Sequence, residues 1–198
     1  MEEVIDMCGR YSLAPEESGE IMEIIRQVQD RIKTGEIFPT NAVPVMMEAG
    51  EEILPEVVEW GYPRFQGKSG QIINARSETV TDRPMFRKSV YERRCVVPTT
   101  GFYEWGKATD GKKQKYRFNL PGERALYLAG LWNEFAGERR CVILTTAANK
   151  SMNGIHDRMP VVLSKEKLRT WVLDTNAALD ILKAVPPALE YAPEVSHG

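Results

Sequence analysis

The first regular hydrophobic pattern in this 198-residue chain predicts a helix from Pro15 to Lys33. Its apolar side chains recur at helical spacing and form one stripe opposite a face rich in charged residues: Ile21, Ile24, Ile25, Val28 and Ile32. Near the C-terminus the pattern predicts two shorter helices, Lys165–Leu173 and Ala177–Val185. A pair of prolines stops the second of these.

Short extended segments account for most of the remaining pattern. Ala42–Met47 and Glu52–Trp60 are predicted to form a hairpin, because a turn that contains glycine separates them. Further strands are predicted where short apolar runs meet turn residues: Ile72–Ile73, Cys95–Val97, Tyr116–Leu120, Tyr127–Leu131 and Cys141–Thr146. Many short strands with few helices indicate the α+β class. We expect a curved, largely antiparallel, barrel-like β core flanked by helices.

The composition limits the classes of protein to consider. A length of 198 residues suits one domain, and the formal net charge of −2 gives no global sign of nucleic-acid or membrane binding. Three cysteines without a close pair argue for a reducing compartment, and no apolar run approaches the roughly 20 residues that span a bilayer. We therefore expect a cytoplasmic protein with no membrane partner. Two histidines and scattered cysteines do not suit a zinc site, so no metal or other cofactor is expected.

Positive charge is concentrated between Arg83 and Arg117. Ten lysines and arginines in this segment, Arg87 among them, are opposed by three carboxylates. A locally basic segment in a slightly acidic protein is typical of a phosphate-binding face. The alternative is an ordinary solvated surface.

Met7-Cys8-Gly9-Arg10-Tyr11 places a thiol, a glycine and a cation near the start of the chain. If the residues before Cys8 are absent, its α-amine and its thiol lie on neighbouring carbons. Such a 1,2-aminothiol can capture an aldehyde, because the amine forms an imine and the sulfur then closes a thiazolidine ring. An unperturbed α-amine has a pKa of about 7.7–8.0 and a thiol one of about 8.5, so both are partly nucleophilic near neutral pH. The alternative is a small buried hydrophobic side chain, as most free cysteines are.

Three later stretches carry further candidate chemistry. Asn74 and Arg76 follow two isoleucines and share one strand face, and such polar groups are costly to bury unless each is paired. Glu104 lies between two aromatic residues, and apolar surroundings would raise the pKa of its carboxyl toward that of a general acid/base. His156 is a natural acid/base group near pH 7. The alternatives are an exposed glutamate and a structural histidine.

These stretches form four motifs in a fixed order: Met7–Tyr11, Asn74–Glu78, Gly101–Trp105 and His156–Pro160. Together they resemble the SRAP family, the SOS-response-associated peptidases. Each motif alone is weak, but four at this spacing are highly specific, and the similarity runs from Met7 to about Leu173. The resemblance implies the SRAP fold and a protein that senses abasic sites in single-stranded DNA during the response to DNA damage. It also implies a covalent thiazolidine crosslink through the N-terminal cysteine, which shields the lesion.

The resemblance further implies roles for four catalytic residues. Cys8 would be the nucleophile and supply both the sulfur and the α-amine. Asn74 would hydrogen-bond near the amine and the new ring. Glu104 would act as acid/base during imine formation, and His156 would help to open the sugar and move protons.

A second implied set of residues would contact the DNA. Arg76 and Arg158 would bind phosphates beside the lesion, with help from Arg10, and aromatic side chains would line the cleft. Stacking on a base contributes about 1–3 kcal/mol and needs no sequence readout. With one arginine added from the basic segment, the expected set is Arg10, Arg76, Arg87, Arg158, Trp60, Phe65 and Trp105.

The chain departs from the family pattern because Cys8 is not its second residue. With Met1–Met7 attached, the nitrogen of Cys8 is an amide, which cannot form an imine. Three explanations stay open: translation begins at Met7, the extra residues are an artefact of cloning or annotation, or the protein cleaves its own Met7–Cys8 bond. The expected organisation is one SRAP domain over residues 1–198, with a leader at 1–6, a globular domain at 7–185 and a tail at 186–198.

Two other functions remain open beside an enzyme that crosslinks itself to abasic sites. A thiol peptidase would use Cys8 with His156 and a carboxylate, acting on itself or on other proteins. A passive single-strand-binding module would leave Cys8 inert. For the leading hypothesis we expect a monomer.

Overall fold

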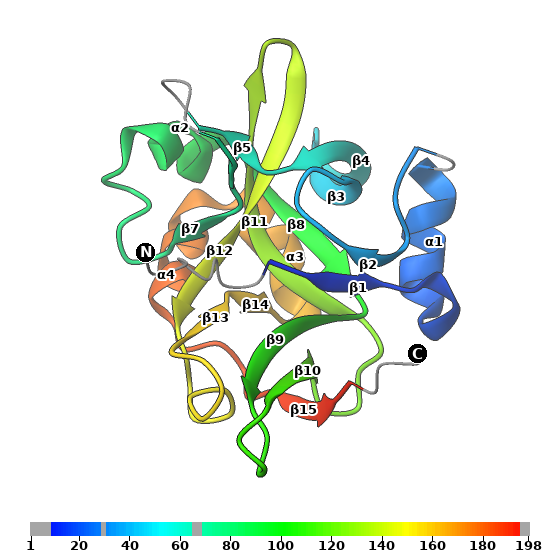
Figure 1. The fold of residues 1–198 in the computed structure, drawn as a ribbon. Coiled ribbons are helices and arrows are strands. Elements are labelled where there is room, and N and C mark those ends of the chain that lie inside the picture. Colours follow the sequence, from blue (N-terminus) through cyan, green and yellow to red (C-terminus); the bar gives the residue numbers. More distant parts are fainter. Residues whose placement is uncertain (1–8, 29–30, 65–68, 195–198) are drawn as a thin grey trace.

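The computed structural model describes residues 9–28, 31–64 and 69–194 (Figure 1). Its centre is a closed ring of five strands, because β12 pairs with both β4 and β11 and the remaining strands complete the circuit. In order around the ring the strands are β12 (Glu138–Ala147), β4 (Glu52–Trp60), β3 (Ala42–Ala49), β8 (Arg94–Thr99) and β11 (Leu126–Phe135). Closure removes the exposed strand edges that an open sheet would leave.

Short strands extend this barrel at its margins. β7 (Asn74–Arg76) and β13 (Arg158–Pro160) both pair with the C-terminal part of β12, and β14 (Val162–Leu163) pairs with β11. β5 (Tyr62–Pro63) and β6 (Gln71–Ile72) form a small ribbon of their own. Of the pairings between described strands, only β12 with β4 and β12 with β7 are parallel.

A second sheet of five antiparallel strands lies against the barrel, with β9, β10 and β15 at the bottom of the view in Figure 1. Its order is β15 (Glu190–Pro193), β10 (Lys113–Asn119), β9 (Gly101–Lys107), β1 (Tyr11–Leu13) and β2 (Gly35–Ile37). The chain passes from the barrel into this sheet between β8 and β9. Gly101 lies at this connection with a φ of 144°, a backbone conformation that residues with a Cβ rarely adopt.

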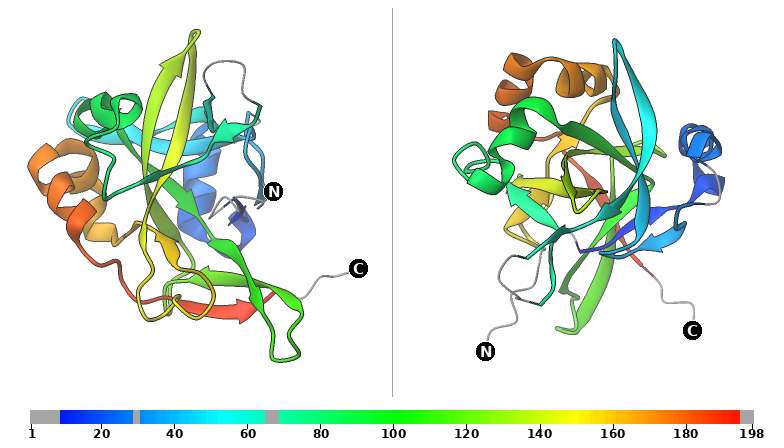
Figure 2. Two further views of the ribbon diagram at one scale, coloured as in Figure 1. Left: turned by 60° about the vertical axis from the view of Figure 1, so that its left-hand side comes forward. Right: turned by 90° about the horizontal axis from the view of Figure 1, so that it is seen from above.

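Helices cover the β core on different sides, as the two views of Figure 2 show for α1 and for the α3–α4 pair. The described helices are α1 (Gly19–Val28), α2 (Pro84–Glu92), α3 (Leu168–Leu173) and α4 (Thr175–Lys183), with 3-10 turns η1 (Pro15–Glu17) and η2 (Lys165–Lys167). None of the helices in the described residues has the length and apolar character to cross a bilayer.

Buried Arg94, in β8 of the barrel, binds two of these helices through hydrogen bonds. Its guanidinium donates to the carbonyls of Trp171 and Val172 in α3, at 2.6 and 2.9 Å, and to that of Val90 in α2, at 2.7 Å. Carbonyls in the last turn of a helix lack partners within the helix. One buried cation therefore caps both C-termini.

The structure confirms the predicted class, a largely antiparallel barrel-like β core with helices around it. The predicted helix Pro15–Lys33 is too long: it divides into η1 and α1, α1 ends at Val28, and residues 31–33 are not helical. The predicted helix Lys165–Leu173 divides into η2 and α3. The predicted tail is wrong in one part, because Glu190–Pro193 forms β15 and pairs with β10. α2 was not predicted, since it has only a short buried face of Phe86, Ser89 and Val90.

Gly101 provides a test of the passage between the two sheets. A Cβ at this position would lie 2.5 Å from Oδ1 of Asn119 and 3.0 Å from the carbonyl oxygen of Phe118. We expect Gly101→Ala to lower the free energy of unfolding by about 3 kcal/mol, from backbone strain and overpacking together. Urea denaturation measures this change.

Gly122→Ala is the matched control, because Gly122 also has a positive φ, but a Cβ added there would meet no heavy atom within 4 Å. Its cost should be about 1 kcal/mol, from backbone strain alone. Equal costs for the two variants would contradict the close packing at Gly101.

Candidate functional site

Strand β12 brings two of the four motifs together. On one edge it pairs in parallel with β7, where Thr145 lies opposite Arg76. On the other edge it pairs with β13, where Thr145 lies opposite Pro160. Neighbouring strands lie about 4.8 Å apart, so the Asn74–Glu78 and His156–Pro160 motifs are held on either side of a single strand.

An ion pair joins the same two motifs directly. Nη2 of Arg158 lies 2.9 Å from Oε2 of Glu78 and 2.9 Å from the carbonyl oxygen of Thr145. The Glu78 carboxylate also accepts a hydrogen bond from the backbone N–H of Ala147, at 3.1 Å. The hydrogen bond from Arg158 lowers the pKa of Glu78 to about 2, so the carboxylate is charged across the physiological range. The Arg158 side chain is only 16% exposed, and this pair occupies it.

His156 is oriented by its own loop. Its Nδ1 accepts a hydrogen bond from the backbone N–H of Arg158, at 3.1 Å, and lies 2.9 Å from a carboxylate oxygen of Asp157. Burial lowers the pKa of His156 below its ordinary value, although Asp157 opposes this effect. A backbone N–H and a carboxylate oxygen thus both face Nδ1, and these two contacts hold the ring in one orientation.

A packing contact connects the His156 loop to the motif around Glu104. A Cβ on Gly106 of β9 would lie 3.1 Å from Cγ2 of Ile155, so the backbone of β9 closely approaches the residue before His156. Glu104 itself is buried, with 3% of its surface exposed. The residue that follows the third motif thus packs against the residue that precedes the fourth.

The first motif joins this group through β1. Tyr11 pairs with Phe102, and the backbone N–H of Tyr103 donates to the carbonyl of Arg10 at 3.0 Å. Gly9, the first residue that the structure describes, therefore comes two residues before the β1–β9 pairing. Cys8 and Phe65 lie outside the described residues.

Arg10 lies in a cationic and aromatic groove on the second sheet. Its guanidinium carbon is 4.4 Å from the ring centroid of Phe38 and 5.2 Å from that of Trp105. Glu36 binds both Arg10, at 3.3 Å, and Lys115, at 2.8 Å. Burial alone would raise the pKa of Glu36, but the hydrogen bonds from these two cations outweigh it and lower the pKa. The groove has a volume of about 670 Å³ and is lined by Arg10, Trp105, Lys113, Gln114, Lys115, Pro193 and Glu194.

A second groove of about 410 Å³ lies between β7 and the start of α2. Asn74 and Arg76 line one side and Arg83 lines the other. Arg76 is exposed, and so is Arg87 on α2. These arginines are available to phosphate oxygens, whereas Arg158 is occupied by Glu78.

Trp60 does not belong to the DNA-contacting set. It is fully buried, it packs on Tyr11 with ring centroids 5.2 Å apart, and its Nε1 donates to the carbonyl of Ile73 at 3.2 Å. A ring with no exposed surface cannot stack on a base. The prediction from sequence was wrong because an aromatic residue at a strand end fits either the core or a cleft.

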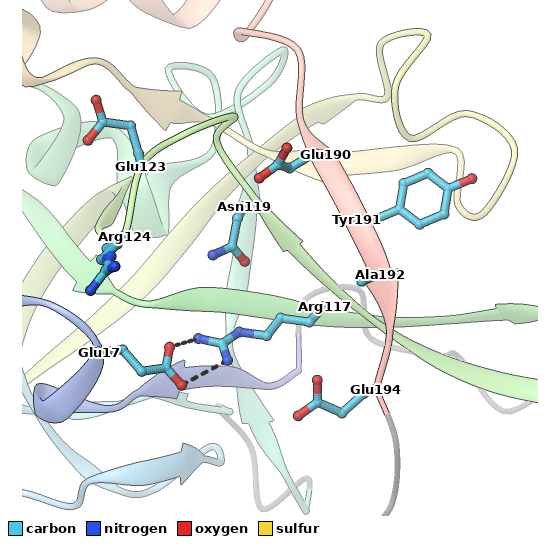
Figure 3. A pocket seen from close by; sticks show the side chains of 9 residues that line it. All are labelled: Glu17, Arg117, Asn119, Glu123, Arg124, Glu190, Tyr191, Ala192 and Glu194. Atoms are coloured by element: carbon cyan, nitrogen blue, oxygen red, sulfur yellow. Dashed lines mark hydrogen bonds and ion pairs between the residues drawn. The ribbon is translucent and has the colours of Figure 1, made fainter.

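The basic segment Arg83–Arg117 does not form one face. Arg94 is buried, and Arg117 is bound in a bidentate pair by Glu17, as Figure 3 shows. That pair lies in a cavity of about 610 Å³ lined by four glutamates and two arginines, together with Asn119, Tyr191 and Ala192. The excess of carboxylates over arginines disfavours binding of a DNA phosphate backbone in this cavity.

Other nucleophiles and metal ligands are limited in the part of the chain that the structure describes. Cys95 and Cys141 are free but buried, and burial raises the pKa of both thiols, so neither is a thiolate near pH 7. Within the described ranges, no group of three or more histidine, cysteine or acidic side chains is placed to hold a metal ion.

Comparison with known proteins decides the family. A family model described as SOS response associated peptidase (SRAP) matches residues 7–196. The chain belongs to the SRAP family. This confirms the resemblance that the four motifs carry.

Relatives of this SRAP chain have names that refer to one lesion. It is 32% identical over 197 residues to abasic site processing protein YoqW of Bacillus subtilis, with 90% of this chain and 86% of that protein covered. It is 27% identical to abasic site processing protein YedK of Escherichia coli, covering 84% and 79%. It is 32% identical over 140 residues to abasic site processing protein HMCES of Xenopus tropicalis, covering 58% and 42%.

Solved structures share the fold of this SRAP chain. A protein of Bordetella bronchiseptica superposes with a TM-score of 0.77 at 22% identity, covering 95% of this chain and all of that one. A phage-related protein from the same organism gives 0.71 at 28% identity, covering 94% of each chain.

Three residues that contact predicted site residues were not predicted from the sequence: Glu36, Phe38 and Glu78. Glu36 and Phe38 come from β2 and the turn after it, which no hydrophobic pattern distinguished. Glu78 was visible within its motif as a carboxylate two residues from an arginine. Its partner, however, is Arg158, 80 positions away, and sequence spacing gives no sign of that pairing.

The Glu78–Arg158 pair can be tested by its dependence on pH. An ordinary glutamate has a pKa of about 4.3. Because the folded pKa is lower, at about 2, the carboxylate stabilises the fold above pH 4.3 and this contribution is lost as the pH falls toward 2. We expect Glu78→Gln to lower the free energy of unfolding by about 1 kcal/mol at pH 7, a value kept small because Glu78 is 44% exposed.

Urea denaturation of both proteins at several pH values measures this effect. The difference between them should shrink between pH 5 and pH 3. Glu23→Gln is the control, because Glu23 forms only an exposed pair with Arg26 and should change stability by a few tenths of a kcal/mol. A Glu78→Gln effect that stays constant over this pH range would contradict the role given to the carboxylate.

Proposed function

We propose that this SRAP protein processes abasic sites in single-stranded DNA by forming a covalent crosslink to the lesion. The proposal is supported by strand pairing and packing that join the elements carrying parts of four motifs far apart in sequence. β1 pairs with β9, β9 contacts Ile155 just before His156, and β12 lies between β7, which begins at Asn74, and β13, which begins two residues after His156. The identity of the lesion is inferred from the names of the relatives, which are abasic site processing proteins.

The proposed chemistry begins at Cys8, which directly precedes Gly9 in the sequence. An abasic sugar in its open form carries an aldehyde at C1′. The α-amine of Cys8 adds to this carbon, and loss of one water gives an imine. The thiol then adds across the C=N bond, with the sulfur on carbon and the proton on nitrogen, which closes the thiazolidine.

Three side chains would move the protons and hold the reacting groups. Glu104 would take the proton from the amine and return it to the departing hydroxyl. As the C1′–O4′ bond breaks, the C1′ hydroxyl loses a proton and the ring oxygen gains one, and His156 would carry that proton between them. Asn74 would hydrogen-bond the new nitrogen. Each acid/base group of this kind contributes typically about 10²–10⁴-fold to a rate.

The DNA strand would bind through the exposed cations and aromatic rings of the two grooves. Arg10 and Trp105 lie in one groove and Arg76 in the other, with Arg87 nearby on α2. Arg158 would act differently from the expectation drawn from sequence. Because Glu78 binds it and little of it is exposed, it would position the His156 loop and would not contact a phosphate.

The nucleophile can be tested with an abasic oligonucleotide and denaturing electrophoresis. A protein that begins at Cys8 should give a denaturation-resistant adduct, and DNA without the lesion should give none. Cys8→Ser retains the amine but has no thiol, so its imine should be trapped only when borohydride is present. A stable adduct of Cys8→Ser without reductant would contradict ring closure by sulfur.

The requirement for a free amine is tested by a matched protein that retains Met7. Its nitrogen at Cys8 is an amide, so it should give no adduct until Met7 is removed, and intact mass reports that removal. Loss of the leader that persists in His156→Ala and Glu104→Ala would assign it to host enzymes. Loss that requires both residues would favour the thiol peptidase.

The acid/base role of Glu104 is tested by single-turnover kinetics of adduct formation. Glu104→Gln keeps the size of the buried side chain and should slow the reaction about 10²–10⁴-fold. Glu134→Gln, at an exposed position of β11, should leave the rate unchanged. An unchanged rate in Glu104→Gln would exclude Glu104 as the acid/base.

A further inference from the structure

Phe38 is an exposed aromatic residue beside the cationic groove. It is 39% exposed, which makes it one of the few large hydrophobic side chains at the surface of the described chain. Single exposed apolar residues are common and need no explanation by themselves. Phe38 differs because a site residue, Arg10, covers part of its ring.

The turn that carries Phe38 is fixed in place. The N–H of Phe38 donates to Oδ1 of Asn41 at 3.0 Å, and the N–H of Asn41 donates to the carbonyl of Phe38 at 3.1 Å. Thr40 adopts a left-handed conformation with a φ of 73°, and its N–H donates to the carbonyl of fully buried Trp60 at 2.8 Å. The backbone of this exposed ring is therefore anchored to the barrel core, which reduces the entropy lost on binding.

Arg10 links Phe38 to Trp105. Its guanidinium carbon lies 4.4 Å from one ring centroid and 5.2 Å from the other, and Glu36 holds it from the side. Cations over aromatic faces within about 6 Å are attracted by the ring electrons. The three side chains form one row, with an exposed ring at its outer end.

We propose that Phe38 stacks on the base next to the abasic site in bound single-stranded DNA. This inference rests on the proposed function. A missing base leaves its neighbour without a stacking partner on one side, and an aromatic side chain can replace that partner. The groove beside the ring carries exposed Lys113 and Arg10, whose side chain stays 41% exposed beside Glu36, and these two cations suit the phosphates on both sides of such a nucleotide.

The surroundings of Phe38 favour a nucleobase over an apolar protein partner. A protein interface needs well over 1,000 Å² of buried surface with an apolar centre. Phe38 is a single ring in contact with Arg10, which in turn is paired with Glu36. A base offers a flat face of similar size joined to negative charge, and both parts match this site.

The test uses an oligonucleotide with a stable tetrahydrofuran in place of the abasic sugar and 2-aminopurine at each flanking position in turn. Stacking quenches 2-aminopurine fluorescence. Wild type should quench it strongly at one position beside the lesion, and Phe38→Ala should lose the quenching at that position alone. Phe38→Trp should retain it.

Affinity and salt dependence distinguish stacking from loss of Arg10. Loss of one stacked base should weaken binding by Phe38→Ala about 5- to 150-fold. The slope of log affinity against log salt should stay the same, because each phosphate contact accounts for about −0.7 of that slope. Leu54→Ala is the matched control, because Leu54 is also an exposed apolar residue, with 45% of its surface exposed. It lies six residues along β4 from Trp60, which binds the turn of Phe38, and six residues of a strand span about 20 Å. The substitution should change neither the affinity nor the salt slope.

The two proposals fail in different ways. Equal quenching and affinity in wild type and Phe38→Ala, or a changed salt slope that accounts for the whole loss, would overturn the stacking inference. With a natural abasic site, saturating DNA should give the same final adduct yield for both proteins. Absence of any adduct, with the position-specific loss of quenching intact, would overturn the proposed function and support the stacking inference.

Discussion

The pairing of strand β12 on both edges is the constraint on which the site depends. Thr145 lies between Arg76 on one side and Pro160 on the other, so one strand fixes the distance between two motifs that are some 80 residues apart. The Arg158–Glu78 pair then closes across that strand from β13 to the turn after β7. Because β12 also completes the barrel, the closed core and the local geometry of the site are stabilised by the same strand.

The barrel and the second sheet carry different predicted site residues. The barrel supplies Asn74 and His156, whereas the second sheet supplies Arg10 and Glu104. They are joined where the chain passes through Gly101 and where Ile155 packs on Gly106, and at both places a larger side chain than glycine would have to displace its neighbours. These contacts join the elements that carry the predicted site residues, and each sheet has one groove lined by some of them.

The sequence was sufficient for the class of fold and for the motifs, because both follow from local pattern. Alternation and turn residues predicted the hairpin of β3 and β4 closely. What local pattern could not provide was pairing over long distances. Trp60 was expected in the cleft and lies in the core, and the last strand, β15, was taken for a tail because its four exposed residues have no apolar periodicity. Glu36 and Phe38 acquire a role only through the position of Arg10, which the fold determines.

The most direct test of the proposed crosslink is a crystal structure of the protein joined to single-stranded DNA that contains an abasic site. The account predicts continuous density from C1′ of the sugar to both the nitrogen and the sulfur of Cys8, with the Glu104 carboxylate, the His156 ring and the Asn74 amide around that ring. A DNA strand attached through another residue, or a thiazolidine remote from Glu104 and His156, would contradict it.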